Sequence, residues 1–118
     1  MLLLWGVNLS SFSHPTNLRC EYLSDPLGID TPFPRLTWLL DDTEYGAKQL
    51  AYRILISTEQ EKLKSGQIDI WDTGRVPSED MLIVYNGKAL KPFTKYYWQV
   101  YVWDKNNKEL HSDVATFE

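Results

Sequence analysis

The chain has 118 residues, 43% of them hydrophobic and 24% charged, which is typical of one soluble globular domain. This composition excludes a disordered, collagen-like or coiled-coil chain. The net charge is −4 and the Lys and Arg residues are scattered, which argues against nucleic-acid binding, since that binding needs basic side chains to neutralise phosphates.

The chain divides into a predicted N-terminal extension, residues 1–16, and a predicted domain, residues 17–118. Met1 to Trp5 is apolar and is similar to a fragment of a secretion signal, although no basic residue precedes it. The stretch is too short to span a membrane, which takes about 20 apolar residues. Two interpretations stay open: a signal remnant, or an edge segment that packs on the domain.

Aromatic residues, which favour β-strands, make up 14% of the chain and include five Trp and seven Tyr. Short runs of β-forming residues are separated by Pro, Gly, Asn and Asp, as is typical of an all-β sandwich or barrel. The runs predict seven strands, at residues 17–23, 35–40, 50–58, 68–73, 81–85, 96–104 and 114–118. Residues 105–109 are predicted to form the turn of the last hairpin.

Alternation within the runs predicts which side chains face the core. Those expected to point inward are Leu18, Cys20, Tyr22, Leu36, Trp38, Leu40, Tyr52, Ile54, Ile56, Tyr96, Trp98, Val100 and Val102. Arg53, Leu55 and Ser57 are expected to point outward. We expect Trp38 and Trp98 to anchor a core between two β layers, because each indole buries a large apolar area.

One helical segment is predicted at residues 58–66. Thr58 is a suitable N-cap, and Glu61 follows it at the spacing of a capping box. Gly66 is expected to end the helix. Leu63 is its single apolar anchor, so we expect one or two turns.

The residues before the longest run have a recognisable spacing. Leu90, Pro92, Thr94, Tyr96 and Trp98 alternate in a pattern similar to that of fibronectin type III domains, in which the Tyr forms a corner. The hydroxyl of a buried Tyr needs a partner, and a nearby backbone group is expected to supply it. Together with the strand pattern, this predicts an all-β, immunoglobulin-like or fibronectin type III-like antiparallel sandwich of about seven strands.

The search for catalytic or metal-binding residues finds no site. Cys20 is the single cysteine, so no disulfide forms within the chain, and it is expected to be a small buried apolar residue. His14 and His111 lack the spacing of a zinc site and are expected to be solvent-exposed loop residues. Asp25 and Asp30 lack the spaced acids of a calcium loop. Since the acid pairs lie in predicted turns or at strand ends, the sequence predicts no catalytic residue, no metal and no cofactor.

Three aromatic residues are the candidate binding residues. Tyr97, Tyr101 and Trp103 alternate with the core positions of one strand and are expected on its outer face. Such a row indicates a domain interface, a platform that stacks on sugar rings, or ordinary cross-strand pairing. The sequence leaves these three interpretations open.

Several blocks of the chain resemble, in the same order, the N-terminal segment of bacterial α-L-rhamnosidases. The blocks are LRCEY at 18–22, PLGID at 26–30, PRLTW at 34–38, QxAYRI at 49–54, WDTGRV at 71–76 and YWxVxVWD at 97–104. The resemblance extends from about residue 18 to the last residue. Within the matched blocks, Gly28 and Gly74 are expected at turn positions. Arg35 and Arg75 are expected to pair with turn carboxylates such as Asp30 or Asp72.

The resemblance implies a fibronectin type III-like module at the front of a much larger glycoside hydrolase. In that family the catalytic carboxylates lie in an (α/α)6 barrel after this module, so no catalytic residue is carried onto this chain, and we expect no activity from it alone. The implied partners are the downstream domains of the same polypeptide. A carbohydrate-binding module and a free-standing adhesion domain are the alternatives. The compartment is undetermined, with export to a bacterial periplasm or cell surface as an expectation.

Overall fold

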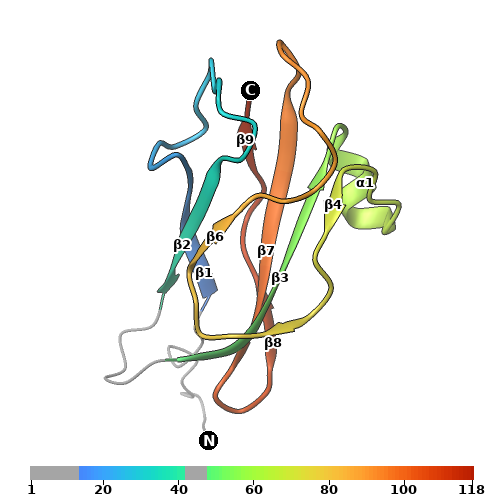
Figure 1. Ribbon diagram of the computed structural model, residues 1–118. Helices are drawn as coiled ribbons and strands as arrows, with labels where there is room; N and C mark the ends of the chain where they lie inside the picture. Colours follow the sequence, from blue (N-terminus) through green and yellow to red (C-terminus); the bar gives the residue numbers. More distant parts are fainter. Residues whose placement is uncertain (1–13, 42–47) are drawn as a thin grey trace, which may run out of the picture.

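The computed structural model describes residues 14–41 and 48–118, which form two antiparallel β-sheets packed face to face (Figure 1). The smaller sheet has the order β1-β2-β6, with β1 at His14–Cys20, β2 at Arg35–Asp41 and β6 at Leu82–Val84. The larger sheet has the path β4-β3-β7-β8, with β5 also paired to β3 and β9 to β7. Its strands are β3 (Gln49–Ser57), β4 (Trp71–Asp72), β5 (Val76–Pro77), β7 (Tyr96–Asp104), β8 (Glu109–His111) and β9 (Ala115–Phe117).

The predicted antiparallel β-sandwich is therefore confirmed, and the strand count is larger than predicted. The described part of the chain holds nine strands, and the two that the sequence did not predict are β5 and β8. β5 has two residues and β8 has three, too few to show an alternating pattern. β8 begins at Glu109, inside the segment predicted as a turn. β1 begins at His14, three positions before the predicted start.

The core lies between the sheets, where alternation in β2, β3 and β7 places apolar side chains. Tyr96, Trp98, Val100 and Val102 of β7 are buried, and the residues between them are half-buried. The core cluster is made of Cys20, Leu36, Trp38, Tyr52, Ile54, Ile56, Tyr85, Tyr96, Trp98, Val100, Val102, Leu110 and Phe117. Trp38 from the smaller sheet and Trp98 from the larger are both in this cluster, as expected.

One buried polar side chain connects the layers. Gln49 is 1% exposed, and its Oε1 accepts a hydrogen bond of 3.0 Å from Nε1 of Trp38. Its Nε2 donates to the backbone oxygens of Ser78 and Asp80, at 3.1 and 2.6 Å. Because its amide has partners on both sides, Gln49 holds β2, β3 and the segment before β6 together without leaving a buried polar group unpaired.

The predicted tyrosine corner is present. Tyr96 is 3% exposed, and the backbone N–H of Lys91 donates to its hydroxyl at 2.8 Å. The Tyr96 ring stacks on Phe117 of β9, with centroids 5.3 Å apart. This contact fixes the loop before β7 against the end of the chain.

The outward positions of β3 include two that the prediction assigned wrongly. Leu55 and Ser57 are 4% and 0% exposed. The helix α1 (Gln60–Ser65) packs against β3 and β7 on this outer face, and its Leu63 is buried there (Figure 1). A short amphipathic helix therefore turns one end of the outer face into a second, smaller core.

The end of α1 is predicted correctly and its start is not. Gly66 has a φ of 80°, and its N–H donates to the oxygen of Lys62. The N-cap is Glu59, which makes no capping hydrogen bond with its side chain. The Thr58 hydroxyl donates instead to Asp69, at 2.6 Å, so it ties the helix to the segment before β4.

The turn after β1 explains two further errors. Glu21 and Tyr22 both have positive φ values, 51° and 66°, and the backbones of Cys20 and Leu23 bond to each other across them. Tyr22 thus lies beyond the strand and is 53% exposed, not inward-facing as predicted. Arg35 pairs with Glu21 at 2.7 Å and lies over the Tyr22 ring, so its partner is not Asp30 or Asp72.

The other predicted arginine pair is also wrong, whereas the glycine predictions hold. Arg75 donates to Oδ1 of Asn107 at 2.6 Å, and Asp72 pairs with Arg53 at 2.7 Å. Gly28 and Gly74 have φ values of 78° and 67°, a region that residues with a Cβ rarely adopt. The glycines follow local backbone geometry, whereas the ion pairs depend on which strands meet.

Candidate functional site

The outer face of β7 carries the three aromatic residues predicted as binding residues. Tyr97, Tyr101 and Trp103 are half-buried and lie on one face of the strand. Each has a neighbour against its ring: Nζ of Lys95 is 5.4 Å from the Tyr97 centroid, the His111 ring is 5.4 Å from that of Tyr101, and the Arg75 guanidinium is 4.7 Å from that of Trp103. Their role as interface or sugar-stacking residues stays a prediction.

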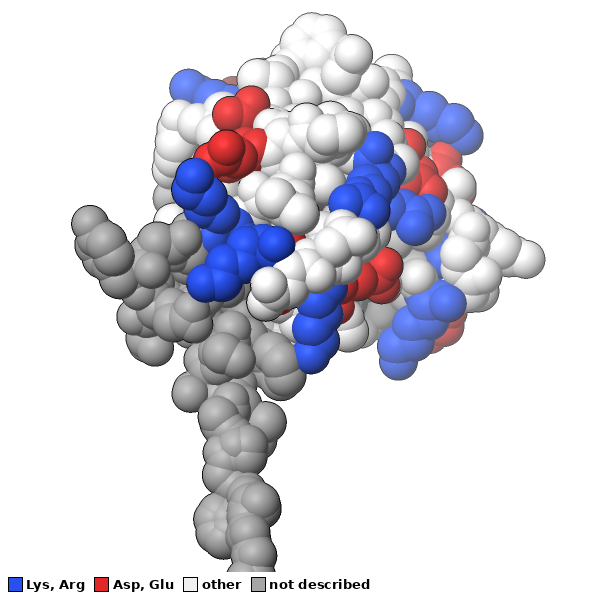
Figure 2. Space-filling view, turned by 90° about the horizontal axis from the view of Figure 1, so that it is seen from below, with Lys and Arg blue, Asp and Glu red and all other residues white. Residues whose placement is uncertain are grey.

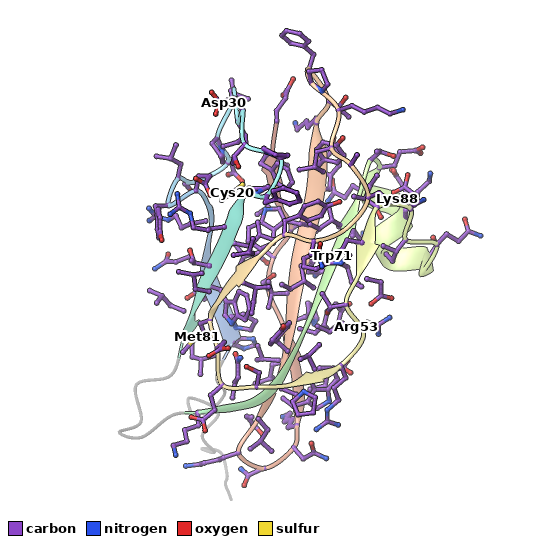
Figure 3. All side chains as sticks on the ribbon, viewed as in Figure 1. Cys20, Asp30, Arg53, Trp71, Met81 and Lys88 are labelled. Atoms are coloured by element: carbon purple, nitrogen blue, oxygen red, sulfur yellow. The ribbon has the colours of Figure 1, made fainter. Side chains whose placement is uncertain are left out.

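An ion pair occupies the middle of the same face. Arg53 lies opposite Tyr101 in the β3–β7 register, and its Nε and guanidinium nitrogen donate to the two carboxylate oxygens of Asp72 at 2.9 and 2.7 Å. These hydrogen bonds lower the pKa of Asp72. Figure 3 shows Arg53 beside the β3–β4 side of the sandwich. The ion pair and α1 each cover part of the outer face of the larger sheet.

A pocket lies at the end of the sandwich where the last residue, Glu118, is located. Its volume is about 620 Å³. Its walls come from the β1–β2 loop, from the loop before β7, and from the end of β9; they are Leu27, Gly28, Ile29, Asp30, Thr31, Pro32, Leu90, Lys91, Pro92, Phe93, Tyr96, Phe117 and Glu118. Figure 1 shows both loops and the C-terminus together at the top, and Figure 3 labels Asp30 there.

Backbone hydrogen bonds hold the last residues against the β1–β2 loop. The N–H of Glu118 donates to the oxygen of Pro26 at 3.0 Å, and the N–H of Ile29 donates to the oxygen of Glu118 at 2.8 Å. The N–H of Thr116 donates to Oδ1 of Asp25 at 2.9 Å. Gly28, with its positive φ, allows the loop to turn between these contacts. The last residue of the chain is therefore fixed in the wall of the pocket.

Large apolar side chains are exposed around this pocket. Phe93 is 99% exposed and has a φ of 54°, which is unfavourable for a residue with a Cβ. Leu27 and Phe33 are 78% and 59% exposed. The sequence prediction did not select these residues. The signal was present for Phe93, since an apolar residue stands in a polar turn between Pro92 and Thr94.

Among the described residues, every carboxyl group whose pKa is shifted has a lowered pKa. Hydrogen bonds from Arg35 lower the pKa of Glu21 to about 2. Burial opposes ionisation of Asp69, but hydrogen bonds from Thr58 and Lys62 outweigh it, so the pKa falls to about 2. With Asp72, these groups are held as carboxylates that stabilise turns.

The residues considered for metal binding or nucleophilic chemistry are dispersed. Asp25 binds Thr116, and the described residues contain no group of three or more His, Cys, Asp or Glu side chains that could hold a metal ion. Cys20 is 1% exposed and projects between the sheets (Figure 3), and burial raises the pKa of its thiol to about 12. His14 and His111 are exposed, but they lie in β1 and β8 rather than in loops.

Charge is mixed on the end of the molecule opposite the C-terminus. Figure 2 views this end and shows Lys and Arg interspersed with Asp and Glu where the grey residues do not cover it. Among the described residues, no helix is both long and apolar enough to span a membrane. The apolar stretch from Met1 to Trp5 lies outside the described residues.

Comparison with known proteins gives consistent matches. The family model described as the Rha78A-like, N-terminal immunoglobulin domain matches residues 15–118. Two proteins named alpha-L-rhamnosidase, from Formosa agariphila and Streptomyces avermitilis, are 39% and 40% identical over 73% and 75% of this chain. Those matches cover 9% and 8% of the two relatives, so the chain spans about a tenth of their length.

Solved structures match the fold as well. The structure of alpha-L-rhamnosidase from Dictyoglumus thermophilum superposes with a TM-score of 0.85 at 39% identity, covering 92% of this chain and 12% of that one. The structure of Streptomyces avermitilis alpha-L-rhamnosidase complexed with L-rhamnose gives a TM-score of 0.83 at 35% identity, covering 90% of this chain and 10% of that one. The sandwich, its tyrosine corner and these matches agree, and the chain belongs to the family of Rha78A-like N-terminal immunoglobulin domains.

Proposed function

We propose that this chain is the non-catalytic, N-terminal accessory domain of an α-L-rhamnosidase-like glycoside hydrolase, and that it packs against neighbouring domains of the same polypeptide. The observation that carries the proposal is the extent of the matches. Relatives named alpha-L-rhamnosidase align with most of this chain, yet the aligned part is 8–9% of their length. Most of such a protein therefore lies outside the domain, and the reaction is assigned to that remainder.

The carboxylates of the domain support a non-catalytic role. Hydrolysis of a glycoside uses two facing carboxyl groups, of which one has a raised pKa so that it can donate a proton to the leaving oxygen. Glu21, Asp69 and Asp72 have lowered pKa values instead. Each is also engaged by a basic side chain, at 2.7 to 3.0 Å. Groups held in this way are poor proton donors near neutral pH.

The closed interior supports the same role. Trp38, Trp98 and their neighbours fill the space between the sheets, and a sugar ring would have to bind on the outside. On the outer face of β7, the rings of Tyr97, Tyr101 and Trp103 already contact Lys95, His111 and Arg75. A sugar that stacked on these rings would have to displace those contacts.

The test compares the 118-residue chain with a longer polypeptide that carries it. We expect no hydrolysis of an aryl α-L-rhamnoside by the 118-residue chain and no saturable heat of binding with L-rhamnose. We expect the longer polypeptide to hydrolyse the substrate, and to unfold at a lower temperature when residues 14–118 are deleted. Hydrolysis by the short chain would contradict the proposal. Saturable rhamnose binding that is lost in Trp103→Ala would favour the carbohydrate-binding alternative.

A further inference from the structure

We propose that the end of the sandwich around Leu27, Pro32, Phe93 and Glu118, here called the C-terminal surface, is the docking surface for the polypeptide that follows Glu118. The inference rests on the proposed function and goes beyond it, since it assigns the contact to one surface of the domain. The sequence pointed to a different surface, the outer face of β7.

The first argument is the direction in which the chain leaves the domain. Both backbone groups of Glu118 are hydrogen-bonded to the β1–β2 loop, at Pro26 and Ile29. Glu118 is also part of the pocket wall. A residue attached to Glu118 would therefore start at the wall of the pocket. Attachment at this point raises the effective concentration of the following polypeptide at the pocket.

The second argument is the exposure of apolar side chains at the same place. Phe93 exposes 99% of its surface and Leu27 exposes 78%. Phe33 adds a further exposed ring in the β1–β2 loop. Single exposed apolar residues are ordinary, but several grouped around a pocket indicate a contact surface. Leu27 and Phe93 line the same pocket as the fixed end of the chain.

The third argument is the conformation of Phe93. Its φ of 54° is a left-handed value that is sterically unfavourable for a residue with a Cβ. Phe93 lies between the two partners of the corner hydrogen bond, in which the Lys91 N–H donates to the Tyr96 hydroxyl. The loop presents an aromatic ring to solvent next to a hydrogen-bonded corner. A rigid aromatic side chain loses little conformational freedom when a partner buries it, as is typical of anchor residues.

The pocket has room for side chains of a protein partner, and small ligands bind in pockets of the same size. A volume of about 620 Å³ accepts several apolar side chains. The predicted occupant is therefore an apolar segment of the following domain that enters the pocket while Phe93 enters a complementary cavity on that domain. Interfaces between domains of one chain commonly bury about 600–1,500 Å².

Another exposed apolar face lacks such a link to the chain end. Leu39, Leu82 and Val84 are 55%, 45% and 52% exposed on the outer side of the smaller sheet. In the β2–β6 register, Val84 lies opposite Arg35 and Leu82 opposite Thr37, so the three exposed side chains share one face of the sheet. No residue of β6 is among those that line the pocket. These residues provide a matched control for the C-terminal surface.

The experiment is hydroxyl-radical footprinting of the 118-residue chain and of the longer polypeptide encoded by the same reading frame. We expect oxidation of Phe93 and Leu27 to fall several-fold in the longer polypeptide, while oxidation of Leu39 and Leu82 stays unchanged. A parallel arm adds L-rhamnose to the 118-residue chain. Protection of Phe93 by the sugar would overturn the proposal in favour of a sugar subsite.

A pair of variants gives an independent readout. Phe93→Ala is expected to leave the unfolding temperature of the 118-residue chain unchanged, because the ring is solvent-exposed, and to lower that of the longer polypeptide. Leu82→Ala is the control and is expected to have the same effect in both. Equal effects of Phe93→Ala in the two contexts would overturn the proposal.

The outcomes separate the docking surface from the proposed function. Protection of the β7 face or of Leu39 and Leu82, with Phe93 still oxidised, would overturn the C-terminal surface and leave a packed accessory domain. Unchanged oxidation everywhere in the longer polypeptide would overturn both. A reading frame that ends at Glu118 would also overturn both.

Discussion

Trp38 and Trp98 allow one substitution to be compared at two buried positions that differ in hydrogen bonding. The two side chains are 1% and 0% exposed and belong to the same core cluster. Nε1 of Trp38 donates to Gln49 at 3.0 Å. Nε1 of Trp98 is buried and has no hydrogen-bond partner among the described residues. Trp38→Phe and Trp98→Phe therefore remove the same atoms from similar packing and differ in what they do to polar groups.

The expected free energies of unfolding follow from this difference. Each substitution loses apolar volume from a close-packed core, at a cost of about 1–3 kcal/mol. Trp38→Phe also leaves Oε1 of Gln49 buried without its donor, which costs about another 1–3 kcal/mol. Trp98→Phe removes an unpaired buried N–H, which returns a similar amount, about 1–3 kcal/mol. We expect Trp98→Phe to be nearly neutral and Trp38→Phe to be more destabilising by about 2 kcal/mol or more.

The measurement is urea unfolding of the 118-residue chain, followed by far-ultraviolet circular dichroism because each variant loses a fluorescent indole. Trp103→Phe is the control, on the same strand as Trp98 but half-buried on the outer face, and it should cost less than about 1 kcal/mol. Equal costs for Trp38→Phe and Trp98→Phe would refute the assignment of the hydrogen bond. A larger cost for Trp98→Phe would refute it more strongly.

Three other results are expected of the same chain. Hydrogen bonds from Arg35 lower the pKa of Glu21 from 4.5 to about 2, so the Glu21–Arg35 pair contributes fully to stability above about pH 5 and loses its contribution as the pH falls toward 2. The urea midpoint of unfolding, measured from pH 5 to pH 2, should therefore depend less on pH in Glu21→Gln than in the unmodified chain. The same pH dependence in both would contradict the pairing. A Cβ at Gly87 would lie 2.7 Å from Cγ of Trp71, which is closer than such atoms pack. Gly87→Ala should therefore lower the free energy of unfolding by about 1–3 kcal/mol. An unchanged free energy of unfolding would show that the Trp71 ring can move away. Burial raises the pKa of Cys20 to about 12, so the native thiol should resist iodoacetamide at pH 8 and react after unfolding in urea; rapid labelling of the native chain would argue against its burial.

The parts of the fold that the sequence predicted are those governed by local pattern. β7 alternates over nine residues, so the burial of Trp98 and Val100 follows from the period of a strand. The tyrosine corner was also predictable, because the spacing between Lys91 and Tyr96 lies within one loop. Strands of two or three residues, such as β5 and β8, are held by their neighbours and leave no such pattern.

The parts that were not predicted depend on which segments meet in three dimensions. Leu55 alternates as an outward residue, yet α1 covers it, so its burial depends on a helix that follows in sequence and folds back. Arg35 finds Glu21 fourteen residues away because β1 and β2 pair. The sequence alone does not reveal this strand register, so it could not identify Glu21 as the partner of Arg35.

The candidate binding surface shows the same limit. Tyr97, Tyr101 and Trp103 were selected because their alternation is visible in the sequence, and their function stays a prediction. The C-terminal surface brings together two loops and the end of β9, which are separated by up to about ninety positions, as the Asp25–Thr116 hydrogen bond illustrates. Phe93 gains significance because it lines the same pocket as Glu118, and sequence spacing does not reveal that.

Calorimetric unfolding of the domain, alone and within the longer polypeptide, tests most directly whether it is a packed accessory module. Trp38→Phe identifies the transition that belongs to this domain, because it should shift that transition alone. If the domain packs on its neighbours, its transition occurs at a higher temperature in the longer polypeptide than in the 118-residue chain, since contacts made only by the native state raise stability. The same transition temperature in both would contradict the account.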